Sequence, residues 1–317
     1  MRLRYAKGWV NGNPVAQAVY QLSPWYLFTC RAGDIWPGIK EPIPQGTPGA
    51  GDFAAICRKE AAALWAEFSS LTVMWSGGID SNLLACLLVE SCPAGASLTL
   101  SGPADRLAAT DDQALNWLRD HGCATVVTDT EVLHQVVADG GMVVTGVHAD
   151  TLLCGDLIRY NDLYAAIWDM SVEEMFVRCS GLAPGAVRGY LERLEPLLAL
   201  MPLARTAANV AWWLDFTCAW DSDAMMAWRV FGLAPGGVGY RDFFAAPAFQ
   251  LWSMQDVALK VGKTADTHKQ LYTNLIAEIV GFMPNLPLRT EIDEEVKMER
   301  VWGEVIGIRE DWSLIQL

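Results

Sequence analysis

Short apolar runs alternate with longer segments of helical character between residues 71 and 145. Continuous apolar runs bounded by turn residues are typical of strands buried on both faces, and a three- or four-residue apolar spacing is typical of helices. The predicted strands are 71–75, 96–101, 124–128 and 142–145, and the predicted helices are 81–91, 106–121 and 131–138. This alternation predicts an α/β fold with a mostly parallel sheet and helices on both faces.

The segment before this core has a different composition. Residues 1 to about 50 are rich in Gly, Pro and aromatic residues, and the part from 32 to 51 holds four prolines and predicts a loop. The segments 16–21 and 25–30 are candidates for short strands. Residues 52–69 have the Ala, Leu, Glu and Lys content that favours a helix.

The segment after the core predicts helices only. No strand is expected after Gly155, and residues 157–280 form helical stretches broken by Gly and Pro. We therefore predict a small N-terminal cap region at 1–70, an α/β core at 71–155 and a helical C-terminal region at 156–317.

The charge balance narrows the choice of partners. The 317 residues include 23 Lys and Arg against 37 Asp and Glu, a net charge of −14. Nucleic-acid affinity comes mainly from Lys and Arg, so this balance argues against a nucleic acid as the main partner. No apolar run approaches the ~20 residues of a membrane span, and none follows the basic start as in a signal peptide. We expect a cytoplasmic protein with no membrane partner, and the sequence indicates no oligomeric state.

The cysteines and histidines do not form a metal-binding pattern. None of the eight cysteines belongs to a C-x-x-C pair, and the four histidines are scattered. The ligand spacing of zinc and iron–sulfur sites is therefore missing. Free, mostly buried thiols in a reducing compartment are the expected state.

The most informative string is SGGIDS at 76–81, between a predicted strand and a predicted helix. Glycines let the backbone approach a ligand, and a helix N-terminus offers free N–H groups and the positive end of its dipole. With the hydroxyls of Ser76 and Ser81, the segment is suited to phosphates. Asp80 fits such a site when Mg²⁺ lies between the carboxylate and the phosphates. The structural alternative is a tight turn capped by Asp80 and Ser81.

This string resembles the PP-loop of the ATP pyrophosphatase superfamily, S-G-G-x-D-S. Members of that superfamily bind ATP, release pyrophosphate and transfer AMP to a substrate oxygen. The Walker pattern G-x-x-x-x-G-K-[ST] and the G-x-S-x-G of serine hydrolases are absent from the chain. The resemblance implies a PP-loop adenine-nucleotide-binding domain that acts with ATP and Mg²⁺.

A second string, TGVHADTLLCG at 145–155, follows the fourth predicted strand. Open α/β sheets bind ligands at the carboxyl ends of their strands. The string resembles the S-G-E-G-[SA]-D-E-L-[FL]-x-G signature of asparagine synthetases and β-lactam synthetases. The resemblance implies that Gly146 lies against the nucleotide and that Asp150 helps to hold Mg²⁺ and pyrophosphate.

Later segments extend the resemblance from about residue 72 to 284. The segment 241–249 is similar to the R-x-P-F-L-D-x-x-F segment of that branch, and 266–271 to its late Lys-containing helix. By this match Lys269 is the preferred cation for stabilising charge on the α-phosphate, and Lys263 is the alternative. The chain resembles small stand-alone asparagine-synthetase-like proteins, many of them encoded by phages.

The departures from the signature concern the substrate end of the site. Val147 stands where the signature has Glu, His148 where it has Gly, and Thr151 where it has a second Glu. Valine accepts no hydrogen bond from a substrate ammonium, so aspartate is not expected to be the substrate. Arg2 stands where the glutaminase half of the family needs a cysteine nucleophile, so ammonia or an amine must come from elsewhere.

The sequence therefore predicts an ATP- and Mg²⁺-dependent ligase that forms an acyl-adenylate from a small carboxylate and then an amide with ammonia or an amine. Another PP-loop ligase, similar to NAD or GMP synthetase, and a non-catalytic ATP-binding module are the alternatives. The nucleotide-binding candidates are Ser76, Gly77, Gly78, Asp80, Ser81, Leu100 and Gly146, the metal ligands Asp80 and Asp150, and the catalytic candidates Lys269 and Lys263.

Overall fold

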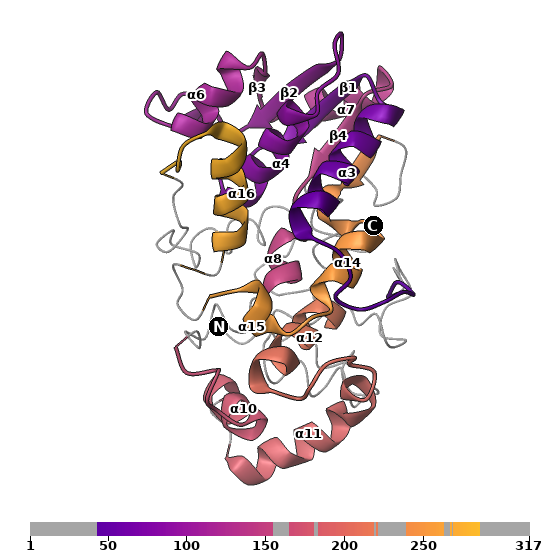
Figure 1. Cartoon of the computed structure of the whole chain (residues 1–317), viewed down its shortest axis with the longest axis vertical. Helices are drawn as coiled ribbons and strands as arrows, with labels where there is room; N and C mark the ends of the chain where they lie inside the picture. The colour runs from indigo at the N-terminus through magenta and orange to yellow at the C-terminus, as the bar shows by residue number, and fades with distance from the viewer. Residues whose placement is uncertain are drawn as a thin grey trace, which may run out of the picture.

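The computed structural model describes residues 43–154, 165–180, 183–218, 220, 239–262, 267 and 269–285. A parallel sheet with its covering helices lies at one end of the molecule, and a group of helices lies at the other (Figure 1). The candidate strands 16–21 and 25–30 and the candidate Lys263 fall outside the described residues. No described helix has both the length and the apolar character needed to cross a membrane.

In the described part of the chain, one sheet contains all the strands, and every neighbouring pair is parallel. The strands are β1 (Ser70–Met74), β2 (Ser97–Gly102), β3 (Ala124–Val127), β4 (Met142–Thr145) and β5 (Tyr240–Asp242). Their order is β3-β2-β1-β4-β5, the doubly wound order of Rossmann-like folds. The predicted α/β fold with a parallel sheet is confirmed.

The prediction that strands stop after Gly155 is wrong. β5 (Tyr240–Asp242) pairs with β4, and Asp242 lies opposite Thr145 in the register. Three residues that include Arg241 and Asp242 make no apolar run, so the hydrophobic pattern carries no signal for this strand. The strand brings Asp242 to the end of β4, more than ninety residues earlier in the chain.

Helices cover the two faces of the sheet in two separate cores. On one face, Leu71, Val73 and Val144 belong to the large core that also contains α4 (Ile79–Glu90) and α6 (Gln113–Asp120). On the other face, Val143 packs with Leu133 of α7 (Thr130–Ala138). The alternation of side chains along a strand explains why successive residues of β4 enter different cores.

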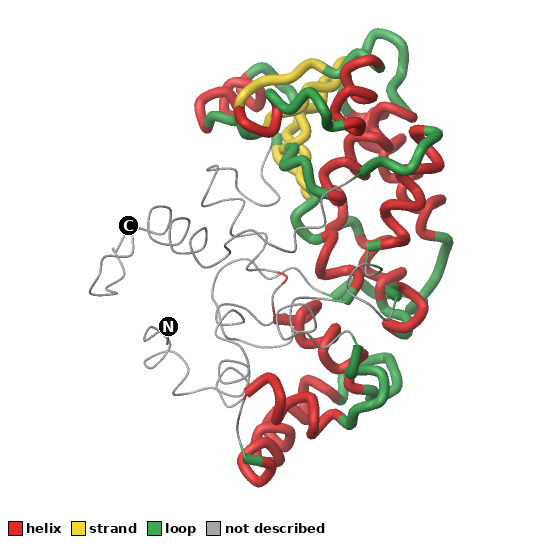
Figure 2. Tube along the Cα trace, turned by 90° about the vertical axis from the view of Figure 1, so that its left-hand side faces the viewer, coloured by secondary structure: helices red, strands yellow, loops and turns green. Residues whose placement is uncertain are grey.

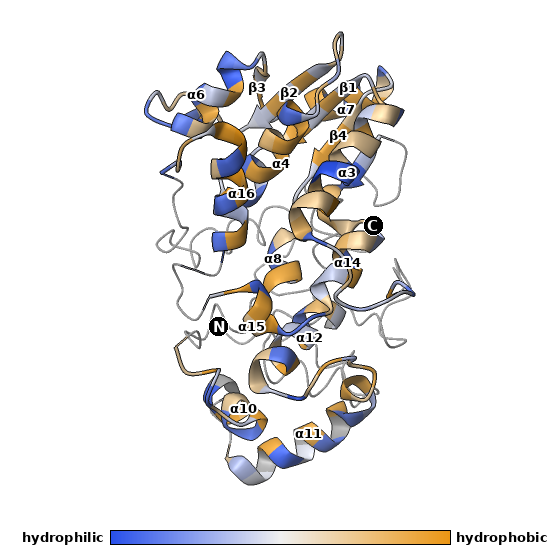
Figure 3. Ribbon diagram, viewed as in Figure 1, coloured by the Kyte–Doolittle hydropathy of each residue, from blue (hydrophilic) through white to orange (hydrophobic). Residues whose placement is uncertain are grey.

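Two of the predicted helices differ from those in the structure. The stretch 106–121 is divided into α5 (Ala104–Leu107) and α6 (Gln113–Asp120), because the Asp112 side chain accepts a hydrogen bond from the N–H of Leu115 and starts a new helix. The helix predicted at 81–91 is α4, and it is buried on nearly all sides instead of on one face. Its hydrophobic character is visible in Figure 3.

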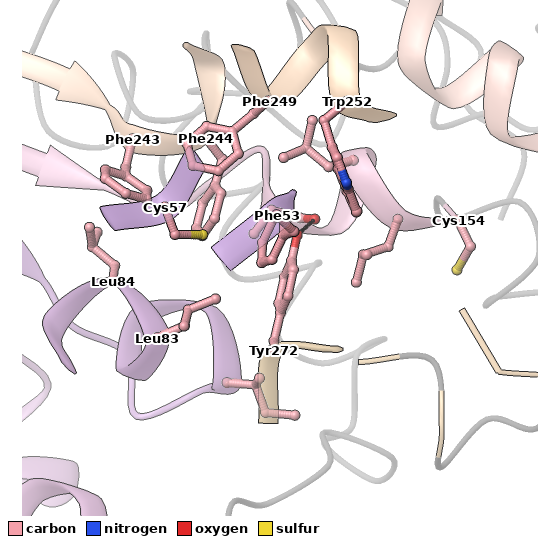
Figure 4. Close-up of a cluster of buried hydrophobic side chains, with 14 of the residues drawn as sticks. Phe53, Cys57, Leu83, Leu84, Cys154, Phe243, Phe244, Phe249, Trp252 and Tyr272 are labelled. Carbon is pink, nitrogen blue, oxygen red and sulfur yellow. Dashed lines mark hydrogen bonds between the residues drawn. The ribbon is translucent and has the colours of Figure 1, made fainter. Parts of the chain in front are cut away.

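The remaining helices pack beside the sheet and form the other end of the molecule (Figure 2). They are α3 (Phe53–Glu67), α8 (Ala149–Leu153), α10 (Val172–Ser180), α11 (Pro184–Leu198), α12 (Ala207–Cys218), η3 (Phe243–Ala245), α14 (Pro247–Ser253), α15 (Val257–Lys260) and α16 (Gln270–Val280). An aromatic cluster joins several of them: Phe53 stacks on Tyr272 with centroids 5.2 Å apart, and Phe244 and Phe249 lie 5.2 Å apart (Figure 4).

Gly102 is required where β2 ends beside the residue that follows β1. A Cβ atom at this position would lie 2.7 Å from the carbonyl oxygen of Trp75 and 2.9 Å from its ring. Trp75 is buried, and its indole donates to Asn82 Oδ1 at 2.9 Å. A side chain at 102 therefore pushes on the backbone that leads into the SGGIDS segment.

We predict that Gly102→Ala lowers the free energy of unfolding by about 1–3 kcal/mol, because the new methyl group meets backbone that cannot move freely. The matched control is Gly189→Ala in α11, where a Cβ meets nothing within 4 Å. That change is expected to stabilise the protein by up to about 1 kcal/mol, since alanine favours a helix. Urea unfolding of both variants measures the effects, and a neutral Gly102→Ala contradicts the prediction.

Candidate functional site

The strand order itself places the candidate site. β1 and β4 are neighbours in the sheet, but the chain continues from β1 towards one edge of the sheet and from β4 towards the other edge. Ligands of open α/β sheets bind at such a switch point. The SGGIDS segment follows β1, and the segment from Gly146 to Asp150 follows β4. Both sequence motifs therefore meet at the same edge of the sheet.

The first loop is held in shape by its own side chains. Ser81 Oγ donates to the carbonyl of Gly78 at 3.1 Å and accepts from the N–H of Ser76 at 3.2 Å. Asn82 Nδ2 donates to the carbonyl of Gly77 at 3.1 Å, and Gly77 has a φ of 77° that favours glycine. α4 begins at Ile79 without a side-chain cap, so its first N–H groups face the loop.

Three charged side chains meet between the two loops. Lys269 Nζ lies 2.5 Å from Asp80 Oδ2 and 2.6 Å from Asp150 Oδ1. The side chain of Lys269 is 9% exposed, that of Asp80 21% and that of Asp150 33%, so the ammonium is the most deeply buried member. Burial favours a lower pKa for Lys269, but the charges and hydrogen bonds of Asp150 and Asp80 outweigh it and raise the pKa above its ordinary value.

These three residues come from three helix N-termini. Asp80 is in the first turn of α4, Asp150 in the first turn of α8, and Lys269 is the N-cap residue of α16. Helix N-termini carry partial positive charge and attract anions. The three helix N-termini and the ammonium together form a positively charged region that can bind a polyphosphate. The two carboxylates then need a further cation as their partner.

The two carboxylates fit a magnesium ion that shares its shell with phosphates. One ammonium contacts both of them, so one cation can reach both. Mg²⁺ is usually held by one or two carboxylates together with substrate phosphates and water. Among the residues that the structure describes, no group of three His, Cys, Asp or Glu side chains is arranged to hold a metal ion. Asp80 and Asp150 therefore suit a metal that arrives with a nucleotide.

The second loop contacts the first and is tied to β5 through Asp242. A Cβ atom at Gly146 would lie 3.3 Å from the Phe244 ring and 3.7 Å from the carbonyl oxygen of Asp80. Asp242 Oδ2 accepts from Thr145 Oγ1 and from the N–H of Val147, both at 2.7 Å. The carboxylate thus fixes the backbone on both sides of Gly146.

His148 anchors the same loop from inside the protein. The ring is buried, with Nδ1 3.4 Å from Asp242 Oδ1 and Nε2 2.8 Å from the carbonyl oxygen of Trp220. It stacks on the Trp220 indole with centroids 4.1 Å apart. Val147 packs against the smaller core of Leu133 and Tyr240. The signature positions that depart from the expected pattern are therefore occupied by side chains that make contacts within the protein.

The structure brings together most of the predicted site residues. Asp80, Asp150 and Lys269 are in contact, and Gly146 lies beside the Asp80 backbone. Leu100 is not brought to the site, because its side chain is fully buried in the core two residues before the end of β2.

Sequence reasoning missed two residues. Arg106 of α5 is half-buried, and its Cδ would lie 3.7 Å from a Cβ at Gly77. Asp242 is the last residue of β5, and its oxygens accept hydrogen bonds from Thr145, Val147, Phe244 and Ala245. An Asp at the end of a three-residue strand gives no local signal for this role.

No protein-family model matches the chain, and no curated protein matches its sequence.

We predict that Lys269→Met destabilises the protein, because Asp80 and Asp150 then lose their shared counter-ion. Since folding raises the pKa of Lys269, its stabilisation is complete below the ordinary value of 10.5 and is lost as the pH rises through the folded-state pKa. The difference in unfolding free energy between wild type and variant should thus be constant from about pH 7 to about pH 10, where both carboxylates are ionised, and shrink above that range. Urea unfolding across this range measures it.

The exposed Lys59→Met serves as the control and should show little difference from wild type at any pH. A Lys269→Met difference that stays unchanged far above pH 10.5, or that grows, contradicts the assignment of the ion pair.

Proposed function

We propose that the protein is an ATP- and Mg²⁺-dependent ligase of asparagine-synthetase-like type, which activates a carboxylate as an acyl-adenylate and then forms an amide. The observation that carries the proposal is the contact of Lys269 with Asp80 and Asp150 at the switch point of the sheet. The PP-loop resemblance of residues 76–81 and the resemblance of 145–155 to the synthetase signature support the same conclusion.

Each residue has a role in this proposal. The loop from Ser76 to Gly78 and the N-terminus of α4 bind phosphates, and Asp80 and Asp150 hold Mg²⁺. A substrate carboxylate oxygen attacks the α-phosphorus of ATP, the bond to the bridging oxygen of pyrophosphate breaks, and pyrophosphate leaves with the electron pair. Lys269, turned from the carboxylates to the phosphates, stabilises the charge that develops there. Ammonia or an amine then attacks the acyl carbon, AMP leaves and the nitrogen loses a proton.

The two alternatives differ in their products. A ligase similar to NAD or GMP synthetase also releases AMP and pyrophosphate but forms a different bond, and a binding module binds ATP without turnover. Incubation with Mg-ATP and a metabolite extract, followed by mass spectrometry for AMP, pyrophosphate and any new amide, separates these outcomes. Production of ADP and phosphate without AMP contradicts the whole class.

We predict that Asp80→Ala reduces pyrophosphate release by about a hundredfold or more, because a ligand of the Mg²⁺ that would stabilise the reacting phosphates is lost. The fold is expected to be retained, since Asp80 is partly exposed at the start of α4. The control is Asp169→Ala, which removes an exposed carboxylate from a turn outside the site. Normal pyrophosphate release by Asp80→Ala would refute the assignment of the PP-loop.

At position 147, where the signature has Glu, the second loop offers no carboxylate to a substrate ammonium. Val147 packs in the smaller core, and Asp242 accepts hydrogen bonds from the N–H groups of Val147 and Phe244. Burying an unpaired ammonium costs several kcal/mol, and even ~3 kcal/mol corresponds to more than a hundredfold in affinity. We therefore propose that the carboxylate substrate has no α-ammonium or is considerably larger than aspartate.

A matched pair of substrates tests this proposal. Succinate has the carbon skeleton of aspartate without its ammonium, so we predict that succinate supports AMP formation at least as well as aspartate does. Steady-state kinetics with each acid, Mg-ATP and ammonia measure the ratio of kcat/KM. Efficient formation of asparagine, well above the reaction with succinate, contradicts the inference from Val147.

A further inference from the structure

The helix that carries Asp150 is too short to hold itself in place. α8 spans five residues, Ala149–Leu153, and Asp150 lies in its first turn. The last four carbonyl groups of any helix lack partners within the helix, and helices this short are not stable alone. The position of the Asp150 carboxylate therefore depends on whatever binds the carbonyl groups of α8.

Three side chains from three other helices donate to these carbonyl groups. Tyr272 Oη of α16 donates to Ala149 O at 2.8 Å, and Trp212 Nε1 of α12 donates to Thr151 O at 3.0 Å. Lys260 Nζ, at the end of α15, donates to Leu152 O at 3.0 Å. All three donors are buried, so no water competes with them. We call these side chains the α8 clamp.

Lys260 is the charged member of the α8 clamp. Its Nζ also donates to Ser253 O at 2.7 Å and lies 3.9 Å from the centroid of the Trp212 ring. Two carbonyl groups and one ring face thus account for the three N–H bonds of an ammonium. Within the described part of the chain it has no carboxylate within ion-pair distance, and burial lowers its pKa well below the ordinary value.

Burying the lysine side chain in this way costs free energy, and this cost has no benefit if the side chain only fills space. A methionine side chain has a similar length, needs no hydrogen bonds and is buried at no electrostatic cost. A lysine in this place instead donates hydrogen bonds to Leu152 O, at the carboxyl end of α8, and to Ser253 O. The interaction fixes the end of α8 that lies opposite to Asp150.

We infer that Lys260 is a positioning residue for the metal site: together with Tyr272 and Trp212 it holds α8, and through α8 it places the Asp150 carboxylate opposite Asp80. The inference rests on the proposed function for the identity of the metal, but it concerns the geometry of this chain. Lys260 touches neither carboxylate, and it acts only through the backbone of α8.

Binding of Mn²⁺, a paramagnetic substitute for Mg²⁺, tests the inference without an activity assay. Free Mn²⁺ is measured by electron paramagnetic resonance in solutions of the full chain with ATP. Lys260→Met should weaken Mn²⁺ binding about tenfold, as expected when a group that orients a metal ligand is lost. Leu259→Ala, on the same helix and 76% exposed, is the control and should leave Mn²⁺ binding unchanged.

A double-mutant cycle separates positioning from general damage to the fold. In an Asp150→Asn background, Lys260→Met should have no further effect on Mn²⁺ affinity, because the ligand that it places is already absent. Equal effects in both backgrounds overturn the inference, and so does unchanged Mn²⁺ binding by Lys260→Met. Wild type that binds no Mn²⁺ in the presence of ATP overturns it as well.

Tyr272→Phe keeps the inference testable if Lys260→Met does not fold. It removes one donor of the α8 clamp without changing charge or shape, and the same cycle with Asp150→Asn applies. The proposed function fails separately: wild type that releases no pyrophosphate, but whose Mn²⁺ binding depends on Asp150 and Lys260, refutes the ligase and leaves the positioning role. Conversely, wild type that releases pyrophosphate, with Mn²⁺ binding that neither Asp150→Asn nor Lys260→Met changes, refutes the positioning role and leaves the ligase.

Discussion

The ammonium of Lys269 is the interaction on which the geometry of the site depends. It contacts Asp80 and Asp150, which come from loops after two different strands. Two carboxylates that share one ammonium repel each other, and the cation between them offsets this repulsion. The lysine comes from more than a hundred residues later in the chain than either loop, and it therefore joins the sheet to α16.

The position of Lys269 also has a cost that the carboxylates offset. A lysine at the N-cap of α16 lies at the positive end of that helix, where an acidic residue would be favoured. On the proposed function, Asp80 and Asp150 would hold the metal, and Lys269 together with the helix N-termini would bind the phosphates.

The sequence predicts those helices and strands whose local hydrophobic pattern agrees with their place in the fold. β4 has the predicted bounds Met142–Thr145, because three apolar residues and a threonine between two glycines favour a short buried strand. β5 could not be predicted, since Tyr240–Asp242 is a strand only because β4 offers it a partner. Asp80, Asp150 and Lys269 were found through their motifs. Lys260 has no local signal, because its role depends on the carbonyl group of Leu152, which is 108 residues away in the sequence.

The contacts of Val147 and His148 show what these residues do at the two positions where the signature has Glu and Gly. The N–H of Val147 and the ring of His148 both face Asp242, a residue of β5, and His148 also reaches the carbonyl of Trp220. The synthetase signature has Glu and Gly at these two positions of the loop. In this chain, contacts with other residues of the protein hold the loop in place. A flexible glycine and a carboxylate suit a loop that adapts to a small charged substrate. A loop held by a buried histidine and an aspartate is already ordered before any ligand arrives, so it loses less entropy on binding. On the proposed function, recognition of the carboxylate would then depend on segments other than this loop.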